Sequence, residues 1–302
     1  MSVRALGVIA LLAVTPAFAA TAINETRALD ADGQVHIDNV KGKIVVRTWS
    51  QPQVRITGSL GKGVEKLAVT GDAHSLSIEV KYPNSHGGWN LWGRDDRRTE
   101  PSIIEVMMPQ RASLDIDSVS ADVDVQQMAG RKLSVDSVSG DIVVTASSPG
   151  EASFESVSGD VTLRITTSSV QAESVSGDVS LQGGLTGEVS LESVSGSLSV
   201  IAKAIDDLRV SSVSGDATLR TGLKAGGEIK AETLSGTVDL TLPKSTGAKL
   251  HAETFSGDIS SLAGHVHREE HGPGESLDTT FGNGQGKIRL ESFSGDVRVN
   301  LD

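Results

Sequence analysis

Apolar and polar residues alternate along most of this chain, in short runs separated by Ser-Gly-Asp segments. Leu133, Val135, Ile142 and Val144 illustrate the alternation. A period of two residues, rich in Val, Ile, Ser and Thr, is typical of β-strands and not of helices. Gly reaches backbone angles that are closed to other residues, and Asp bonds to nearby backbone groups, so Ser-Gly-Asp favours a tight bend. We therefore expect short strands joined by tight turns.

One seven-residue segment, typified by DSVSGDI from Asp136, recurs along the chain with small changes. Its fifth residue falls at 121, 140, 159, 177, 196, 215, 236, 257 and 295, so the steps are 18 to 21 residues until a last step of 38. We interpret that last step as two coils with one copy of the segment skipped or overwritten. A fixed period of about 20 residues indicates a stacked-repeat architecture.

These features predict an all-β fold, a single-stacked β-solenoid (β-helix) with coils of about 19 residues. Like residues would lie above like residues in coils about 4.8 Å apart. A leucine-rich repeat would need a Leu-rich consensus with Asn, which this sequence lacks. We expect one turn position to be structural, because it holds Gly in eight of the nine copies: Gly140, Gly159, Gly177, Gly196, Gly215, Gly236, Gly257 and Gly295.

The chain divides by pattern into a leader, residues 1–19, and one solenoid domain, residues 23–302. The segment Asp38–Ile44 already matches the later repeats, with Asn for Ser and Lys for Asp. Within the domain we expect irregular N-terminal coils at 23–111, regular repeats at 112–262, a loop insertion at 263–280 and a last coil at 281–302.

The leader has the three parts of a secretory signal peptide. Arg4 supplies a positive charge, Ala5–Val14 is a short apolar run, and Ala17 and Ala19 are small residues before a cleavage site. The apolar run is too short to span a membrane. We expect cleavage after Ala19 and export to the periplasm or the extracellular surface, with no transmembrane segment in the mature chain.

One column of residues inside the repeated segment resists simple alternation. It is apolar in all nine copies, whereas strict alternation from Val135 would place its member Val138 on the outside. Either the chain bends so that the column enters the core, or the column is an exposed stripe and an interaction surface. We favour the core, because long bare stripes are rare on soluble proteins. The column is Val119, Val138, Val157, Val175, Val194, Val213, Leu234, Phe255 and Phe293.

Acidic residues form two further columns. In stacked coils, neighbouring carboxylates would lie about 5 Å apart and repel each other. Repulsion would raise the pKa of some members, whereas backbone N–H groups at the turn would lower it. Calcium or magnesium could bridge the columns, because hard ions prefer oxygen ligands; we expect no other cofactor. One column is Asp122, Asp141, Asp160 and Asp178, and the other is Asp117, Asp136, Glu155, Glu173 and Glu192.

Two segments that interrupt the repeats hold side chains with candidate chemistry. Residues 82–101 carry Trp89, Trp92 and a charged run, and we expect an extruded loop that either binds a partner or covers an open end of the solenoid. The insertion at 263–280 contains His265, His267 and His271, which are weak candidates for zinc ligands. A loop rich in Gly and Pro is not a preformed cage, so we predict no metal site.

Composition and motifs restrict the classes of function that we expect for this protein. The chain has no Cys, which excludes disulfides and thiolate metal sites, and its net charge of −12 argues against nucleic acid as a partner. Nine equivalent serines with no His or Lys at a fixed offset suit turns better than nucleophiles, and the sequence has neither a P-loop nor a G-x-S-x-G motif. We predict no catalytic residue, no cofactor-binding residue and no enzyme activity.

Repeated S-V-S-G-D-V units behind a signal peptide, closing on E-S-F-S-G-D-V-R-V from Glu291, resemble a bacterial family of adhesin-like proteins classed as a domain of unknown function. The resemblance covers Val35–Leu301. It implies a β-helix-like fold at or beyond the cell envelope and no catalytic residues. The expected protein is thus a non-catalytic envelope module that binds a surface glycan or protein. The alternatives are a structural element that associates end to end and a glycan-active β-helix enzyme.

Overall fold

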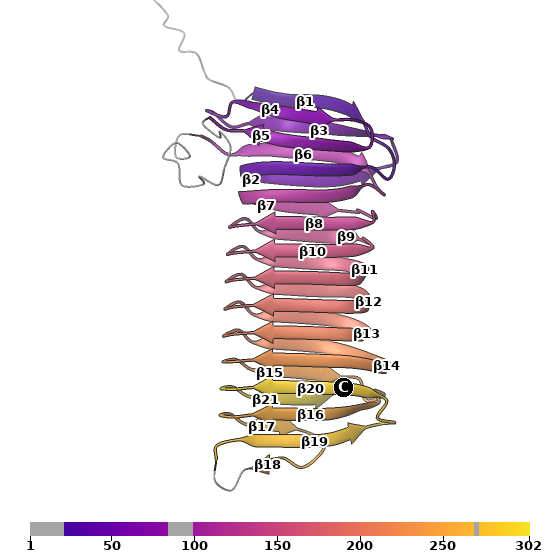
Figure 1. Cartoon of the computed structure of the whole chain (residues 1–302), viewed down its shortest axis with the longest axis vertical. Helices are drawn as coiled ribbons and strands as arrows, with labels where there is room; N and C mark the ends of the chain where they lie inside the picture. The colour runs from indigo at the N-terminus through magenta and orange to yellow at the C-terminus, as the bar shows by residue number, and fades with distance from the viewer. Residues whose placement is uncertain (1–20, 84–98, 269–271) are drawn as a thin grey trace, which may run out of the picture.

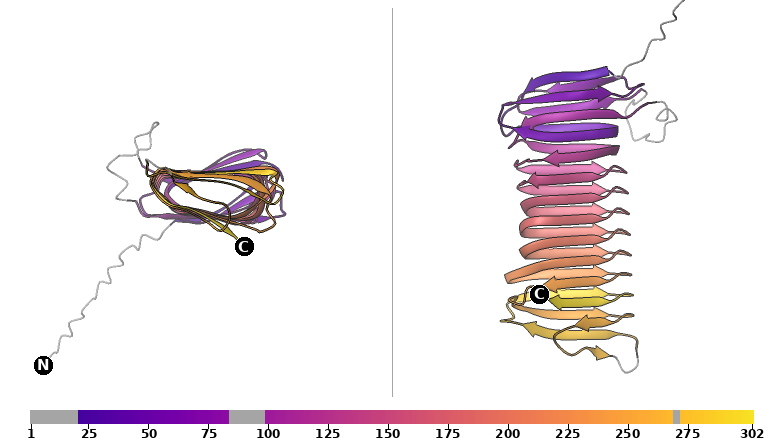
Figure 2. Two further views of the ribbon diagram at one scale, coloured as in Figure 1. Left: turned by 90° about the horizontal axis from the view of Figure 1, so that it is seen from below. Right: turned by 180° about the vertical axis from the view of Figure 1, so that it is seen from behind.

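The computed structural model describes residues 21–83, 99–268 and 272–302, and these residues form strands and turns without any helix. The strands stack as coils along one long axis (Figure 1), and the coils form a flattened ring when the molecule is seen end on (Figure 2). The prediction of an all-β solenoid is confirmed. Since no helix occurs in the described ranges, none there could cross a membrane.

The strands are β1 (Thr21–Ala28), β2 (Gln34–Trp49), β3 (Gln53–Leu60), β4 (Lys66–Gly71), β5 (Ser75–Lys81), β6 (Ser102–Pro109), β7 (Ser113–Gln126), β8 (Lys132–Ser137), β9 (Ile142–Ser147), β10 (Glu151–Ser156), β11 (Val161–Ser174), β12 (Val179–Ser193), β13 (Leu198–Ser212), β14 (Ala217–Thr233), β15 (Val238–Leu242), β16 (Ala248–Thr254), β17 (Ile259–Ser261), β18 (His267–Arg268), β19 (Glu275–Phe281), β20 (Gly286–Ser292) and β21 (Val297–Leu301).

Each regular coil contributes to two opposed faces of the solenoid, and the long strands belong to both because they continue around one edge. Neighbouring strands of the regular coils are parallel and in register, so that Val161, Val179 and Leu198 pair in succession. Face A has the order β4-β5-β2-β7-β8-β10-β11-β12-β13-β14-β20-β16-β19-β18. Face B has the order β1-β3-β6-β2-β7-β9-β11-β12-β13-β14-β15-β21-β17.

The first coil of the repeat pattern is built by β2. Asn39 pairs with Ser118 and Gly42 with Ala121, as the match of Asp38–Ile44 to the later repeats predicts. Asn39 is fully buried where the later coils have Ser. Its Nδ2 donates to the Lys41 carbonyl at 3.1 Å, and its Oδ1 accepts from the Tyr82 hydroxyl at 2.9 Å. Both polar groups of this amide therefore have hydrogen-bond partners although the side chain is buried.

At both ends, the order of coils in space differs from their order in the chain. β2 lies between the β5–β6 coil and β7, and β20–β21 lie between β14–β15 and β16–β17 (Figure 1). The last coil along the chain therefore lies inside the stack and not at its end. The expected loop at 263–280 instead contains β18 and β19, and β19 pairs antiparallel with β16. The 38-residue step holds this reversing strand, from which the chain returns into the stack.

Antiparallel strands cover the terminal coils. β1 and β3 cover face B at the N-terminal end, β4 covers face A there, and β19 covers face A at the other end. Glu275 at the start of β19 is buried, accepts the Ile259 N–H at 2.7 Å and pairs with Arg268. Such strands do not offer the parallel edge that another coil of this solenoid would need.

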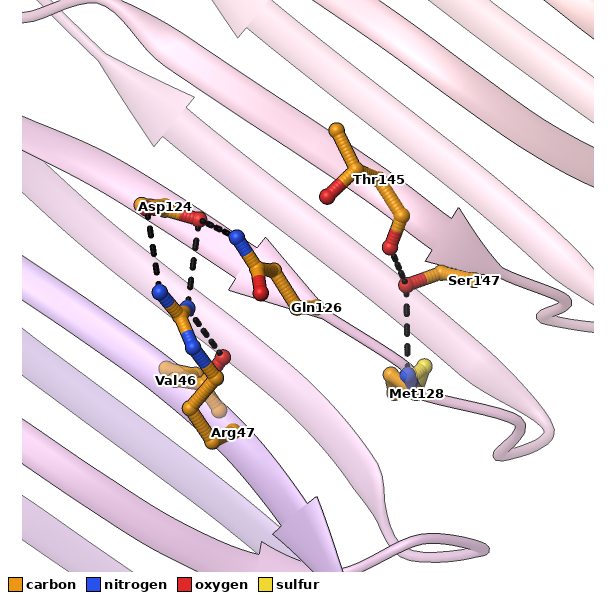
Figure 3. Close-up of polar contacts among 7 residues, drawn as sticks. All are labelled: Val46, Arg47, Asp124, Gln126, Met128, Thr145 and Ser147. Atoms are coloured by element: carbon orange, nitrogen blue, oxygen red, sulfur yellow. Dashed lines mark hydrogen bonds and ion pairs between the residues drawn. The ribbon is translucent and has the colours of Figure 1, made fainter.

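One continuous core fills the solenoid. Inward residues at alternate positions are almost all Val, Leu, Ile or Ala, and the largest is the fully buried Phe154. At the edge away from the repeated turns, polar contacts join the coils (Figure 3). Arg47 on β2 donates to both carboxylate oxygens of Asp124 on β7, at 3.2 and 3.4 Å. Buried Ser147 accepts the Met128 N–H at 3.1 Å. These hydrogen bonds join different coils through polar side chains.

Candidate functional site: a groove beside the repeated turns

The repeated segment forms a turn in which a buried hydroxyl takes the inward position. Ser137 Oγ donates to the Gly140 carbonyl at 3.0 Å and accepts the Gly140 N–H at 3.1 Å. Ser156 and Ser174 make the same two bonds to the glycines three residues later. Because the hydroxyl is fully bonded, a polar side chain can occupy the core side of the turn at little cost.

The following residue points outward, which corrects the core interpretation of the apolar column. Its members Val157, Val194 and Phe255 are 46%, 47% and 53% exposed. Strict alternation continues through the buried Ser, so it is the next side chain that faces solvent. We call the exposed members, in spatial order, the apolar row: Val138, Val157, Val175, Val194, Val213, Leu234, Phe293 and Phe255.

Backbone hydrogen bonds keep this row in register. The N–H of Val157 donates to the Ser137 carbonyl at 3.1 Å, and the N–H of Ser158 donates to the Val138 carbonyl at 2.9 Å. The Ser158 hydroxyl donates to the same Val138 carbonyl. Equivalent bonds recur from coil to coil, so the turns stack as regularly as the strands and project along one edge of the solenoid (Figures 1 and 2). At one end of the row the rings of Phe255 and Phe293 stack with centroids 4.9 Å apart.

Acidic side chains form a parallel row on face A, two residues before the apolar row. Each member pairs in register with the next, and only Ser211 interrupts the series. We call this the acidic row; in spatial order it is Glu79, Asp38, Asp117, Asp136, Glu155, Glu173, Glu192, Glu232, Glu291 and Glu253. It is longer than the sequence column suggested, because the two ends of the chain add members through the altered coil order.

The two rows line one groove that follows the long axis from Asp117 to Phe255 and Phe293. The buried hydroxyl residues lie between the rows, and the apolar row forms the wall on the turn side. Among the lining residues are eight carboxylates and a single basic side chain, Arg289. A groove with one apolar wall and one anionic wall can hold a long ligand that carries both apolar and cationic groups.

The ends and the centre of the acidic row differ in their partners. Near the ends, basic side chains neutralise individual members; these ion pairs are Lys81–Glu79, Lys230–Glu232 and Arg289–Glu291. In the described part of the chain, no Lys, Arg or His forms an ion pair with the four central carboxylates, Asp136, Glu155, Glu173 and Glu192. The centre of the groove is therefore strongly anionic.

Burial raises the pKa of Asp136 to about 6, and the neighbouring Glu155, Asp117 and Asp115 carboxylates add to the rise. Burial also raises the pKa of Asp117 in the next coil and of Asp38 in the coil beyond it. Desolvation is the largest cause for all three carboxyl groups, whereas the sequence alone suggested only repulsion. Repulsion within the row adds to the rise for Asp136 and Asp38, while His36 lowers and Asp115 raises the pKa of Asp117.

Replacing Asp136 by Asn should stabilise the protein near neutral pH by about 1 kcal/mol, after allowance for solvent screening. With a raised pKa, the folded state binds the proton more tightly than the unfolded chain. The wild-type free energy of unfolding should thus fall as pH rises from about 4 to about 6, and the variant should lack this fall. Urea unfolding of both proteins at about pH 4 and pH 7.5 measures the difference. An equal difference at both pH values would contradict the assignment.

The second acidic column, after the turn glycine, has a structural role. Asp141 Oδ1 accepts the Asp160 N–H at 3.0 Å, and Asp160 Oδ1 accepts the Asp178 N–H at 3.0 Å. Asp178 continues the series by accepting the Ser197 N–H at 2.8 Å. These carboxylates bond the backbone of the next coil, as the sequence argument allowed.

Neither of the described histidine candidates lines the groove. His265 and His267 are exposed near β18, and His271, like Trp89, Trp92 and the signal peptide, lies outside the described residues. Across the described ranges, no three His, Asp, Glu or Cys side chains gather as a metal site. Calcium bridging stays a prediction. The eight turn glycines do lie at the turn beside the groove, where a Cβ on Gly159 would meet the Gly140 carbonyl oxygen at 2.1 Å.

The fold can now be compared with known proteins. A solved structure of a candidate lipid-binding protein from Parabacteroides distasonis is 11% identical, covers 93% of this chain and 97% of its own, and has a TM-score of 0.52. A candidate adhesin from Bacteroides fragilis is 12% identical over 93% and 97% of the two chains, with a TM-score of 0.36. At these identities the likeness concerns the fold alone. No curated protein matches the sequence.

A family model gives the assignment. The model described as Toastrack DUF4097 matches residues 110–226 and 221–300, which together make up well over half of the sequence. The matched residues include the regular coils and the returning C-terminal coil, and so most of the groove. The chain belongs to the Toastrack DUF4097 family.

Proposed function

We propose that this protein is an exported, non-catalytic module of the cell envelope that binds an elongated partner along the groove, in the periplasm or at the extracellular surface. The apolar row carries the proposal. Eight apolar side chains lie exposed in one unbroken series, and soluble proteins seldom leave such a surface without a partner.

Export is supported by the leader, not by the fold. Residues 1–19 combine Arg4, the apolar run Ala5–Val14 and small residues before position 20, as a secretory signal does. The proposal therefore places the binding groove outside the cytoplasm.

A glycan-active enzyme is the less favoured alternative. The groove's hydroxyls are committed to turn bonds, as Ser137 and Ser156 illustrate, so they are poorly placed to act as nucleophiles. The carboxylates are repeated evenly along the axis, whereas hydrolysis of a glycoside needs one distinct pair of carboxyl groups in two different environments. A repeated surface is better suited to binding a repeated or elongated ligand.

End-to-end assembly is also less favoured. Further coils would have to add to parallel edges, but β1, β4 and the two-residue β18 outside β19 end the stack in antiparallel strands on three of its four terminal edges. The short β17 is the fourth, and Leu262 after it is 81% exposed. Three residues of free edge are a small surface for a stable assembly.

The groove should bind an apolar, solvatochromic dye that fluoresces when removed from water. Replacing Val157, Val175 and Val194 together by Ser should abolish most of the fluorescence gain, because these side chains form the central wall. Replacing Ile103, Val143 and Ile201 by Ser removes three other exposed apolar side chains and is the matched control. Fluorescence titration of the folded full chain measures both. Equal losses in the two triple variants, or none in the first, would refute a groove site.

A further inference from the structure

We infer that the partner of the groove is a basic amphipathic polypeptide segment, whose apolar side chains contact the apolar row while its Lys or Arg side chains pair with the acidic row. This inference rests on the proposed function, because it assigns a ligand class to the same groove. The two rows are parallel and two residues apart in the coils of the groove, with Ser211 as the one gap in the acidic row, so one linear ligand can contact both rows along the groove.

Charge complementarity identifies the ligand as cationic. The groove lining has eight carboxylates against one arginine, and its four central carboxylates have no ion-pair partner among the described residues. A bound ammonium or guanidinium group would supply the missing partner and favour the ionised form of Asp136, whose pKa burial raises. The same carboxylates would repel an anionic membrane surface, and they would also repel a second copy of this groove.

The apolar row identifies the ligand as amphipathic and elongated. Between Val138 and Val213 the row offers only aliphatic side chains, which bury apolar surface but provide no ring on which a sugar could stack. The stacked Phe255 and Phe293 are confined to one end. The lined coils extend for roughly 38 Å at about 4.8 Å per coil, which corresponds to about 11 residues of extended chain or about 25 residues of helix.

The test uses three labelled peptides of about 12 residues and the full chain. One peptide alternates Lys and Leu, one alternates Glu and Leu, and one alternates Lys and Ser. We expect the Lys-Leu peptide to bind at low salt, with at least about tenfold higher affinity than either of the others, and salt should weaken its binding. The design separates the cationic requirement from the apolar one.

Two variants with equal change in net charge locate the site. Glu155, Glu173 and Glu192 replaced by Gln should weaken Lys-Leu binding about tenfold, because three of the central carboxylates are lost. Glu151, Glu188 and Glu228 replaced by Gln remove three carboxylates of the same face that do not line the groove, and should leave the affinity within about twofold of wild type. Circular dichroism should show that both variants fold.

The outcomes separate this inference from the proposed function. If the two charge variants weakened peptide binding equally, overall electrostatic attraction would explain the effect, and the inference would be wrong. Failure of the Lys-Leu peptide to bind while the dye still requires Val157, Val175 and Val194 would leave the groove as a binding site and refute a basic polypeptide as its ligand. Preferential binding of anionic vesicles or neutral oligosaccharides would do the same. Loss of both signals would refute the proposed function itself.

Discussion

Gly177→Val should destabilise the protein by about 3 kcal/mol or more, whereas Ser180→Val should change the free energy of unfolding by less than about 1 kcal/mol. A Cβ on Gly177 would lie only 2.0 Å from the carbonyl oxygen of Gly159 in the neighbouring coil. Backbone atoms cannot rotate aside as a side chain can, so the two coils would have to separate. Ser180 is exposed on β12, where a β-branched residue fits a strand.

Position 177 requires glycine because of a close contact with the neighbouring backbone and not because of a positive φ angle. The sequence permits either a left-handed conformation or a close approach, and Gly177 is not among the glycines with positive φ. The one copy without glycine, Ala121, lies in β7, which is a strand through this position, and Ser118 makes the same two bonds to Ala121 as the later serines make to their glycines. Thermal melting and urea unfolding of the two variants, measured side by side, test the assignment. Similar melting temperatures for both variants would contradict it.

The solenoid could be predicted because the features that indicate it are found within single repeats and in the spacing between neighbouring repeats. Alternation, the turn residues and the 18–21-residue step all lie within one repeat, and stacking like on like follows from repeating them. The order of the terminal coils could not be predicted in this way. Glu291 pairs with both Glu232 and Glu253, so the repeat of β20 fits equally well beside either neighbour. In the structure the cap strand β19 pairs antiparallel with β16, and β20 takes the place between β14 and β16.

Both walls of the groove can be found in the sequence, but the apolar column is predicted there to enter the core. Apolar character at nine positions suggests burial, whereas the inward position belongs to the hydroxyl residue before each of them. This preceding residue is Ser or Thr in every copy, and a constant hydroxyl three residues before a turn glycine indicates a buried side chain that bonds its own backbone. With Ser137 assigned inward, strict alternation places Val138 outward, as the structure has it.

Phe154 and Phe255 lie in opposite environments, one inside the core and one on the surface. Phe154→Ala should lower the free energy of unfolding by about 3–5 kcal/mol, because Phe154 is fully buried and its removal leaves a cavity in a narrow core. Its neighbours in the stack are Val135 and Ala172, and neither is large enough to fill the space.

Phe255→Ala should cost less than about 1.5 kcal/mol, since Phe255 is 53% exposed and loses mainly its stacking on Phe293. Urea unfolding of the two variants provides the comparison, with far-UV circular dichroism to show that Phe255→Ala keeps the native content of strand. If the Phe255 side chain lay in the core, both substitutions would create cavities and both costs would be large. If Phe255→Ala cost as much free energy of unfolding as Phe154→Ala, the apolar row would be buried. The groove would then have no apolar wall.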